Sequence, residues 1–212
     1  MDAALRRLLD VAVAAALLVL LAPVLGLLAM LVRLTSPGPA FFRQTRIGRH
    51  GRPFELLKLR TMRADAPSIG PTITAGADPR ITWFGARLRC AKLDELPQLW
   101  NIVRGDMSLV GPRPEVPRYV ARYCPAARAA LRVRPGLTDP ASLALEDEAA
   151  VHGRFDDPER AYDEEILPWK LAQSLAYLER RTVWTDLGIV ARTATHVARA
   201  AVRAAWRQGS AP

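Results

Sequence analysis

A long apolar run near the N-terminus limits what this chain can become. Between residues 8 and 32 the only charged residue is Asp10, and about 25 helical residues are enough to cross a hydrocarbon core of about 30 Å. A cleavable signal peptide is the competing interpretation. Its apolar region is usually only about 7–15 residues long, and here a Ser-Pro-Gly-Pro sequence follows instead of a small-residue cleavage site. We therefore predict a membrane helix.

The charges around this run predict how the helix sits in the membrane. Two arginines precede it and five follow it closely, namely Arg6, Arg7, Arg33, Arg43, Arg46, Arg49 and Arg52. By the positive-inside rule both flanks are then cytoplasmic. Pro23, near the middle, removes one backbone hydrogen bond and can kink the helix. A helix that bends at Pro23 and returns to the same face satisfies both observations, while a straight span with a tolerated proline stays open.

The densest group of charged residues is KLDELPQLWNIVRGDMSLVGPRPE, residues 92–115. Pro97 predicts a helix start near residues 94–96, because proline is tolerated in the first turn of a helix. The free N–H groups of that turn would hold Asp94 ionised and offer a docking point for phosphate. The alternative is that Asp94 is only a helix cap.

A rigid corner ends this segment at Pro112, Arg113 and Pro114. The prolines fix the direction of the guanidinium between them, which suits bidentate recognition of a phosphate. A structural pairing of Arg113 with Glu115 or Asp106 is the alternative.

The segment as a whole resembles the signature of the bacterial sugar transferases, monotopic phosphoglycosyl transferases that begin polyprenyl-linked glycan assembly. Lys58 resembles the second lysine of the family's Phe-Lys-x-x-Lys-Phe-x-Thr-Met pattern, here at residues 54–62. Arg89 resembles the family's site arginine five residues before the nucleophile; a weak surface salt bridge is its alternative. The family's re-entrant helix breaks at a Ser-Pro pair, where this chain has Ala22-Pro23.

This resemblance implies transfer of a sugar-1-phosphate from a UDP-sugar to undecaprenyl phosphate, with release of UMP. Asp94 would be the nucleophile that forms an aspartyl-phosphosugar, Glu95 would hold the metal or orient the acceptor, and both carboxylates would bind Mg²⁺. The phosphates or the nucleotide would be held by Lys58, Arg89, Pro112, Arg113 and Pro114. The product would start an exopolysaccharide, O-antigen or glycoprotein glycan.

One departure from the family pattern favours a different function. After the Arg-Pro-Gly-Leu-Thr turn at residues 134–138, relatives carry an Arg-Asn pair where this chain has Glu146 and Asp147. Arg154 or another arginine could substitute, the substrate could be held differently, or activity could be reduced. The alternative function is therefore a catalytically impaired, membrane-anchored scaffold or binding protein of a polysaccharide assembly system.

The fold class implied by the family is α+β, a mostly helical small catalytic domain with short strands. Alternation at residues 54–59 predicts a strand after a hairpin turn at 48–51, and residues 64–77 are predicted to form a loop. Helices are predicted at residues 83–89, 116–133 with an interruption at Cys124-Pro125, and 162–178. We expect a re-entrant membrane helix at 1–36, a cytosolic catalytic domain at 37–183, and an amphipathic C-terminal helix and tail at 184–212.

The C-terminal segment places its cations at helical spacing, namely Arg192, His196, Arg199, Arg203 and Arg207. An alanine-rich apolar stripe lies opposite, with Trp184 and Trp206 near the two ends. Such a helix suits a membrane interface, although a surface helix packed on its own domain is an equal alternative.

Composition excludes little else. The net charge of +9 comes mostly from arginine and accompanies no helix-turn-helix or RNA-binding motif, so we expect no nucleic acid partner. Cys90 and Cys124 form no metal or disulfide pattern, which indicates a reducing compartment. The expected partners are a UDP-sugar, undecaprenyl phosphate and membrane lipids, and a homodimer stays open. The expected location is the inner (cytoplasmic) membrane, with the catalytic domain on its cytoplasmic face.

Overall fold

The computed structural model describes residues 3–70, 73–74, 76, 78–145 and 148–209. The N-terminal half contains α1 (Ala3–Thr35), β1 (Phe41–Ile47), η1 (Arg49–Gly51), β2 (Pro53–Leu59), α2 (Ala66–Ile69), α3 (Trp83–Cys90), η2 (Leu93–Glu95) and α4 (Gln98–Arg104). Next come β3 (Ser108–Val110), α5 (Pro117–Val120), η3 (Ala127–Arg132), β4 (Gly136–Thr138) and α6 (Pro140–Ala144). The last elements are α7 (Glu148–His152), α8 (Pro158–Ala161), η4 (Tyr162–Ile166), α9 (Leu167–Glu179) and α10 (Val183–Gly209). The predicted mostly helical α+β domain with short strands is confirmed.

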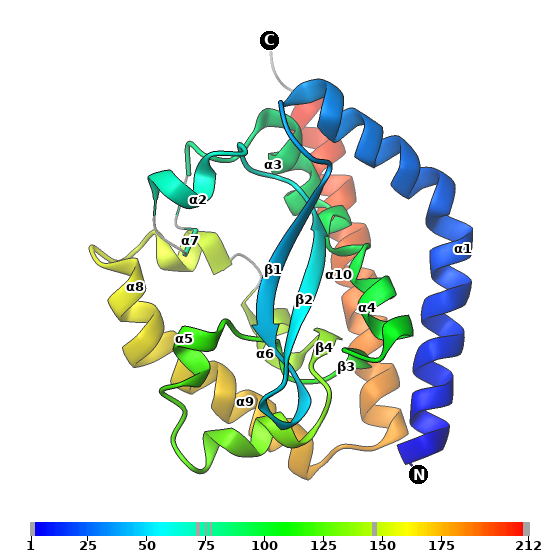
Figure 1. Cartoon of the computed structure of the whole chain (residues 1–212), viewed down its shortest axis with the longest axis vertical. Helices are drawn as coiled ribbons and strands as arrows, with labels where there is room; N and C mark the ends of the chain where they lie inside the picture. The colour runs from blue at the N-terminus through cyan, green and yellow to red at the C-terminus, as the bar shows by residue number, and fades with distance from the viewer. Residues whose placement is uncertain (1–2, 71–72, 75, 77, 146–147, 210–212) are drawn as a thin grey trace.

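Helix α1 is long and apolar enough to cross a membrane by its length and composition. Only 11% of its most apolar 18-residue stretch is buried, whereas the core helix of a soluble protein would be mostly buried. Its outward leucines and valines therefore indicate a membrane anchor. Pro23 lies inside one continuous helix, and α1 changes direction along its course (Figure 1).

One face of α1 packs against the rest of the protein along most of its length. The buried residues Asp10, Ala14, Leu25 and Val32 recur at helical spacing on this face. Ala14 joins a core cluster with residues of β2 and α4, whereas Leu25 and Val32 join another with Leu59 and Leu88. The helix is thus part of the domain's core and not an appendage beside it.

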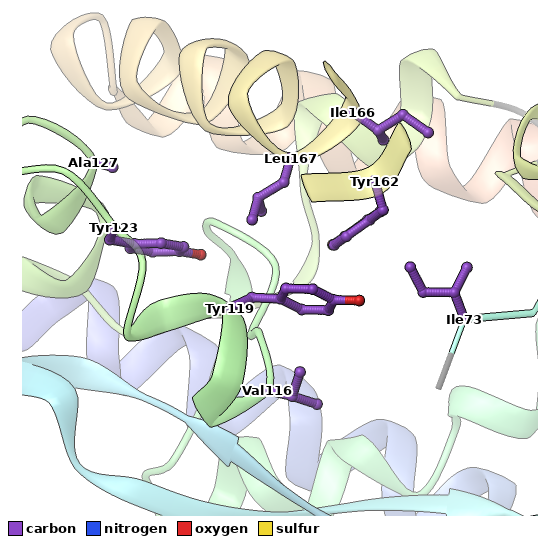
Figure 2. Packing of buried hydrophobic residues seen from close by; sticks show 8 residues of the cluster. All are labelled: Ile73, Val116, Tyr119, Tyr123, Ala127, Tyr162, Ile166 and Leu167. Atoms are coloured by element: carbon purple, nitrogen blue, oxygen red, sulfur yellow. The ribbon is translucent and has the colours of Figure 1, made fainter. Parts of the chain in front are cut away.

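Two small sheets carry the site. Strands β1 and β2 form the predicted hairpin, which is antiparallel with Phe41 opposite Leu59, and its turn places His50 at a φ of 59°. Strands β3 and β4 pair in parallel, with Ser108 opposite Gly136. A third hydrophobic cluster lies between α5, η4 and α9, with Tyr119 and Tyr162 in contact at its centre (Figure 2).

Several predicted helices differ in detail from the structure. Residues 116–133 hold two short helices, α5 and η3, separated around the predicted break at Cys124-Pro125. The helix predicted at residues 162–178 begins with the π-helical turn η4 and continues as α9. The predicted loop at 64–77 contains the one-turn helix α2, and part of it lies outside the described residues, as do Glu146 and Asp147.

The predicted C-terminal helix is present as α10 and packs on the domain along one side. Ile189 is buried against Val110 and Tyr177, and the hydroxyls of Thr193 and Thr138 are hydrogen-bonded at 2.6 Å. On another side Trp184 is 81% exposed and is followed one turn later by the exposed Leu187. The helix therefore combines packing on its own domain with an unburied apolar stripe.

Candidate active site

The acid pair lies on η2, a single 3₁₀ turn that leads into α4. Lys92 introduces this turn in the left-handed conformation, at a φ of 56°. Pro97 is the N-cap of α4 and makes no side-chain cap. The predicted helix start is therefore displaced by a few residues, and Asp94 does not cap α4. A carboxyl that is not used as a cap is available for another role.

Glu95 is held by two cations at once. Its Oε1 accepts hydrogen bonds from Lys58 Nζ at 2.7 Å and from Arg113 Nη2 at 2.8 Å, and its side chain is only 14% exposed. Burial opposes ionisation, but the charges of Arg113 and Lys58 outweigh it and hold the pKa of Glu95 well below its usual range. Glu95 is thus a fixed anion, and the two cations are turned toward it.

Asp94, the neighbouring residue, has the opposite environment. It is buried, and within the described part of the chain no group donates a hydrogen bond to its carboxylate. Burial raises the pKa of Asp94, while the charge of Lys58 acts in the other direction. A carboxylate without a hydrogen-bonding donor has its oxygen lone pairs free, which is the state that a nucleophile needs.

Arg89 projects from α3 beside Asp94 and lines the same cleft. Its Nε donates to the Thr61 hydroxyl at 2.8 Å and its Nη1 to the Thr74 hydroxyl at 3.4 Å. Burial lowers the pKa of Arg89, while the charge of Asp94 opposes this shift. Since the described contacts of Arg89 are to hydroxyls, the surface salt bridge considered as its alternative is not found among them.

Asn101 is a positioning residue that the sequence analysis missed. This fully buried side chain accepts from the Leu57 amide at 3.0 Å and donates to the Glu55 carbonyl at 2.7 Å. It therefore fastens α4, which follows Glu95, to β2, which carries Lys58. An amide among the apolar residues of a short helix is the signal that could have revealed it.

The corner at Pro112 is fixed by a close crossing of β3 and β4. The amide of Gly136 donates to the Pro112 carbonyl at 2.9 Å. A Cβ on Gly111 would lie 2.6 Å from the Arg134 carbonyl oxygen, so only glycine fits at this crossing. The structure thereby aims the Arg113 guanidinium at Glu95. Of the alternative partners, Glu115 is bound by Arg46 and by the Tyr162 hydroxyl, and Asp106 is bound by Arg104.

These side chains face a cleft of about 1590 Å³. The C-terminal end of α1 lines it with Ala29, Met30 and Arg33, and Asp94 and Glu95 line it too. The cleft therefore joins the apolar helix to the acid pair, so that a molecule with an apolar tail and a charged head could reach both.

The two carboxylates fit a magnesium ion bound together with a substrate. Mg²⁺ in proteins is often held by one or two carboxylates and completes its shell with water and substrate phosphates. Asp94 and Glu95 are adjacent in the chain and line the same cleft. Within the described residues no group of three or more His, Cys, Asp or Glu side chains could hold a metal by itself. These donors suit an ion that arrives with phosphate.

The structure brings together Lys58, Asp94, Glu95 and Arg113 by direct contacts or electrostatic interaction, and it places Arg89 beside them. Pro112 and Pro114 contribute by shaping the corner. A buried acidic and cationic cluster, open to a cleft that an apolar helix also lines, is the arrangement expected of a membrane-associated enzyme with anionic substrates.

A family model for bacterial sugar transferases matches residues 1–200. The chain is 43% identical over 201 residues to a UDP-glucose:undecaprenyl-phosphate glucose-1-phosphate transferase of Caulobacter vibrioides. That alignment covers 89% of this chain and 67% of the relative. It is 35% identical over 189 residues to the protein of the same name in Escherichia coli, covering 88% of this chain and 38% of the relative. It is 34% identical over 205 residues to the exopolysaccharide production protein PSS of Rhizobium leguminosarum bv. phaseoli, in an alignment that covers 90% of this chain and 93% of the relative.

The chain belongs to the bacterial sugar transferase family. The resemblance inferred from residues 92–115 and the predicted enzyme class, a transferase, are therefore confirmed.

Proposed function

We propose that this protein transfers a sugar-1-phosphate from a UDP-sugar to undecaprenyl phosphate, and that Asp94 is the nucleophile. The observation that carries the proposal is the contrast within the acid pair: Glu95 is bound by two cations, whereas the Asp94 carboxylate accepts no hydrogen bond from a described residue and lines the cleft. The names of the Caulobacter vibrioides and Escherichia coli relatives support the choice of donor and acceptor.

The reaction consists of two displacements at the same phosphorus. A carboxylate oxygen of Asp94 attacks the phosphorus that bears the sugar, a P–O bond forms, and the bond to the bridging oxygen breaks so that UMP leaves with the electron pair. A phosphate oxygen of undecaprenyl phosphate then attacks the aspartyl-phosphosugar. This step forms the lipid diphosphate-sugar and regenerates the Asp94 carboxylate.

The cations of the site support the charge that develops on the phosphates. Arg89, held by the hydroxyl of Thr61, lies beside Asp94 and remains fully charged, so it can hold a phosphate oxygen. Lys58 and Arg113 lie on the other side of the acid pair. Mg²⁺ held by Asp94 and Glu95 would neutralise the diphosphate of the donor.

We further propose that α1 enters the membrane from the cytoplasmic face and returns to it. Both ends of α1 contact the same domain, since Arg7 donates to the Ile102 carbonyl and Val32 packs with Leu88. A helix that carried its N-terminus to the far side could not keep both contacts. Pro23, between these contacts, and the arginines on both flanks support the same course. The exposed Trp184 stripe of α10 would then lie in the interface.

The proposal is tested by measuring UMP release. The purified protein is given Mg²⁺, undecaprenyl phosphate and each UDP-sugar of a panel in turn. We expect release with one sugar and a loss of about a thousandfold or more in Asp94→Asn, as for removal of a covalent nucleophile. UMP should also appear as a burst when the acceptor is omitted. A strictly ternary kinetic pattern would count against the covalent step.

A specific observation favours the second candidate, a scaffold without turnover, because Glu146 and Asp147 replace a pair that is Arg-Asn in the family pattern. The scaffold function is supported, and the transferase proposal fails, if two results occur together. Folded protein releases no UMP from any UDP-sugar of the panel, and Asp94→Asn leaves glycan assembly in cells undiminished.

A further inference from the structure

Helix α1 is held to the domain by charged side chains near both of its ends. Near the N-terminus, Arg7 donates from Nη2 to the Ile102 carbonyl at 2.7 Å and from Nη1 to the Met107 carbonyl at 3.2 Å. One turn later, Asp10 accepts from the Ser108 hydroxyl at 2.6 Å. These contacts join α1 to the end of α4 and to β3, the elements between the acid pair and the Pro112 corner.

The other end of α1 is held by an arginine of the domain. Arg60 directly follows β2 and is only 6% exposed. Its Nη2 donates to the Ser36 carbonyl at 2.8 Å and to the Gly38 carbonyl at 3.4 Å, and its Nη1 donates to the Pro37 carbonyl. These carbonyls belong to the segment that leaves the helix after Thr35. A guanidinium just beyond a helix C-terminus also interacts favourably with the helix dipole.

The two sets of contacts lie on opposite sides of Pro23. A proline inside a helix removes one backbone hydrogen bond and makes that point easier to bend. About 29 helical residues, or roughly 43 Å, separate Arg7 from Ser36. Beyond Pro23 the apolar side chains of Leu25 and Val32 already pack against the domain. The hydrogen bonds of Arg60 to the carbonyls of residues 36–38 add a directional contact that fixes the end of the helix.

Those last turns form part of the substrate cleft. Met30 and Arg33 line the same cleft as Asp94, and Arg60 lines it too. Arg60 also lies two residues after Lys58, the partner of Glu95, and next to Thr61, which accepts from Arg89. The side chain that holds the end of α1 thus directly follows β2, the strand that carries Lys58.

We propose that Arg60, together with Arg7 and Asp10 near the N-terminus of α1, fixes the position of this helix relative to the active site. In this way it positions the lipid acceptor. This inference rests on the proposed function, because it assigns the wall formed by Met30 and Arg33 to the polyprenyl phosphate. Arg60 is a positioning residue and not a catalytic one, since it acts through the carbonyls of residues 36–38. The donor nucleotide does not depend on this wall.

Gly38 offers a way to disturb the contact without removing the charge. It has a φ of +113°, and a Cβ there would lie 2.7 Å from Arg60 Nη1. Gly38→Ala therefore displaces the guanidinium, and Arg60→Gln removes it. Matched controls are Gly51→Ala, which also has a positive φ (+74°) but where a Cβ meets nothing within 4 Å, and Arg52→Gln, an exposed arginine beside the hairpin turn.

The experiment measures steady-state kinetics in vesicles, with the UDP-sugar and the undecaprenyl phosphate varied in turn. We expect Arg60→Gln and Gly38→Ala to raise the KM for undecaprenyl phosphate about tenfold, as for loss of a charged hydrogen bond, with the KM for the UDP-sugar unchanged. Arg60→Lys should lie between the wild type and Arg60→Gln, and both controls should match the wild type. A fall in kcat alone would overturn the proposal, because a merely less stable protein gives that pattern. Equal changes in both KM values would overturn it too, because the contact would then not be specific to the acceptor.

Hydrogen exchange in the same vesicles tests the contact without relying on catalysis. Arg60→Gln should speed exchange about tenfold at the amides of residues 32–38, and should leave those of residues 10–14 unchanged. If the wild type releases no UMP, the proposed function has failed, and this measurement still decides whether Arg60 holds the end of α1. Unchanged exchange at residues 32–38 would overturn the inference.

Discussion

The two sides of the η2 turn hold their carboxylates in opposite ways. Glu95 faces β2 and the Pro112 corner, and a single oxygen of its carboxylate receives Lys58 and Arg113. Asp94 is buried beside it without a donor from the described residues, and burial raises its pKa. The fold thus stabilises the Glu95 anion through ion pairs and gives the Asp94 anion no such pair, so that the proposed nucleophile is the carboxylate that the fold does not stabilise.

This difference also separates stability from activity. A carboxylate that two cations hold contributes to folding, whereas a buried carboxylate that receives no hydrogen bond from a described residue opposes it. The two acids should therefore respond differently to the same change, from carboxylate to amide.

Glu95→Gln should be the more damaging of the two changes from carboxylate to amide, because it lowers both the stability of the fold and the turnover, whereas Asp94→Asn should lower turnover alone. Lys58 and Arg113 are 22% and 28% exposed and would lose their shared anion, so we expect the free energy of unfolding to fall by about 2 kcal/mol. Turnover should fall about a hundredfold as the two cations lose their fixed positions. Thermal melts and UMP release measure both effects.

Asp65→Asn is the control for that change, since the ion pair of Asp65 with Arg63 is exposed and should contribute little. A Glu95→Gln variant that melts like the wild type would contradict the contrast between the two acids.

Asp94→Asn should abolish turnover and yet not destabilise the fold. The pKa of Asp94 is higher in the folded protein than in the unfolded chain, so protonation favours the fold, and the stability of the wild type falls as the pH rises through the folded pKa. The neutral amide avoids this loss. At pH 8 the free energy of unfolding of the variant should exceed that of the wild type by about 1 kcal/mol, so the variant should melt at a higher temperature. This difference should shrink as the pH is lowered. Melting below the wild type at every pH would contradict a costly Asp94 carboxylate.

The sequence predicted most of the elements and the segments that the structure brings together around η2, because both depend on local patterns. The apolar run gave α1, the alternation at residues 54–59 gave β2, and the motif at residues 92–115 gave the acid pair and the Arg113 corner. The length and spacing of such patterns carry over directly into structure.

Contacts between distant segments could not be predicted in this way. Asp10 was visible as the one charge in the apolar run, yet its partner, Ser108, is 98 residues away. Lys58 and Arg113 were expected to face phosphates, but their shared contact with Glu95 depends on how β2 and the Pro112 corner meet at η2. Such pairings arise from tertiary packing, which leaves no periodic signal in a single sequence.

Thr61→Val should have the smallest effect and sharpens the comparison on the side of Asp94. Valine keeps the shape of the side chain but removes the hydroxyl that accepts from Arg89 Nε at 2.8 Å. The guanidinium stays charged beside Asp94 but loses its orientation, so the KM for the UDP-sugar should rise about threefold with kcat nearly unchanged, as for loss of one hydrogen bond. Thr45→Val, on the exposed side of the hairpin, is the control. An unchanged KM would mean that the nucleotide-sugar does not need Arg89 in this orientation, and the cations gathered around Glu95 would then have to hold the donor phosphates.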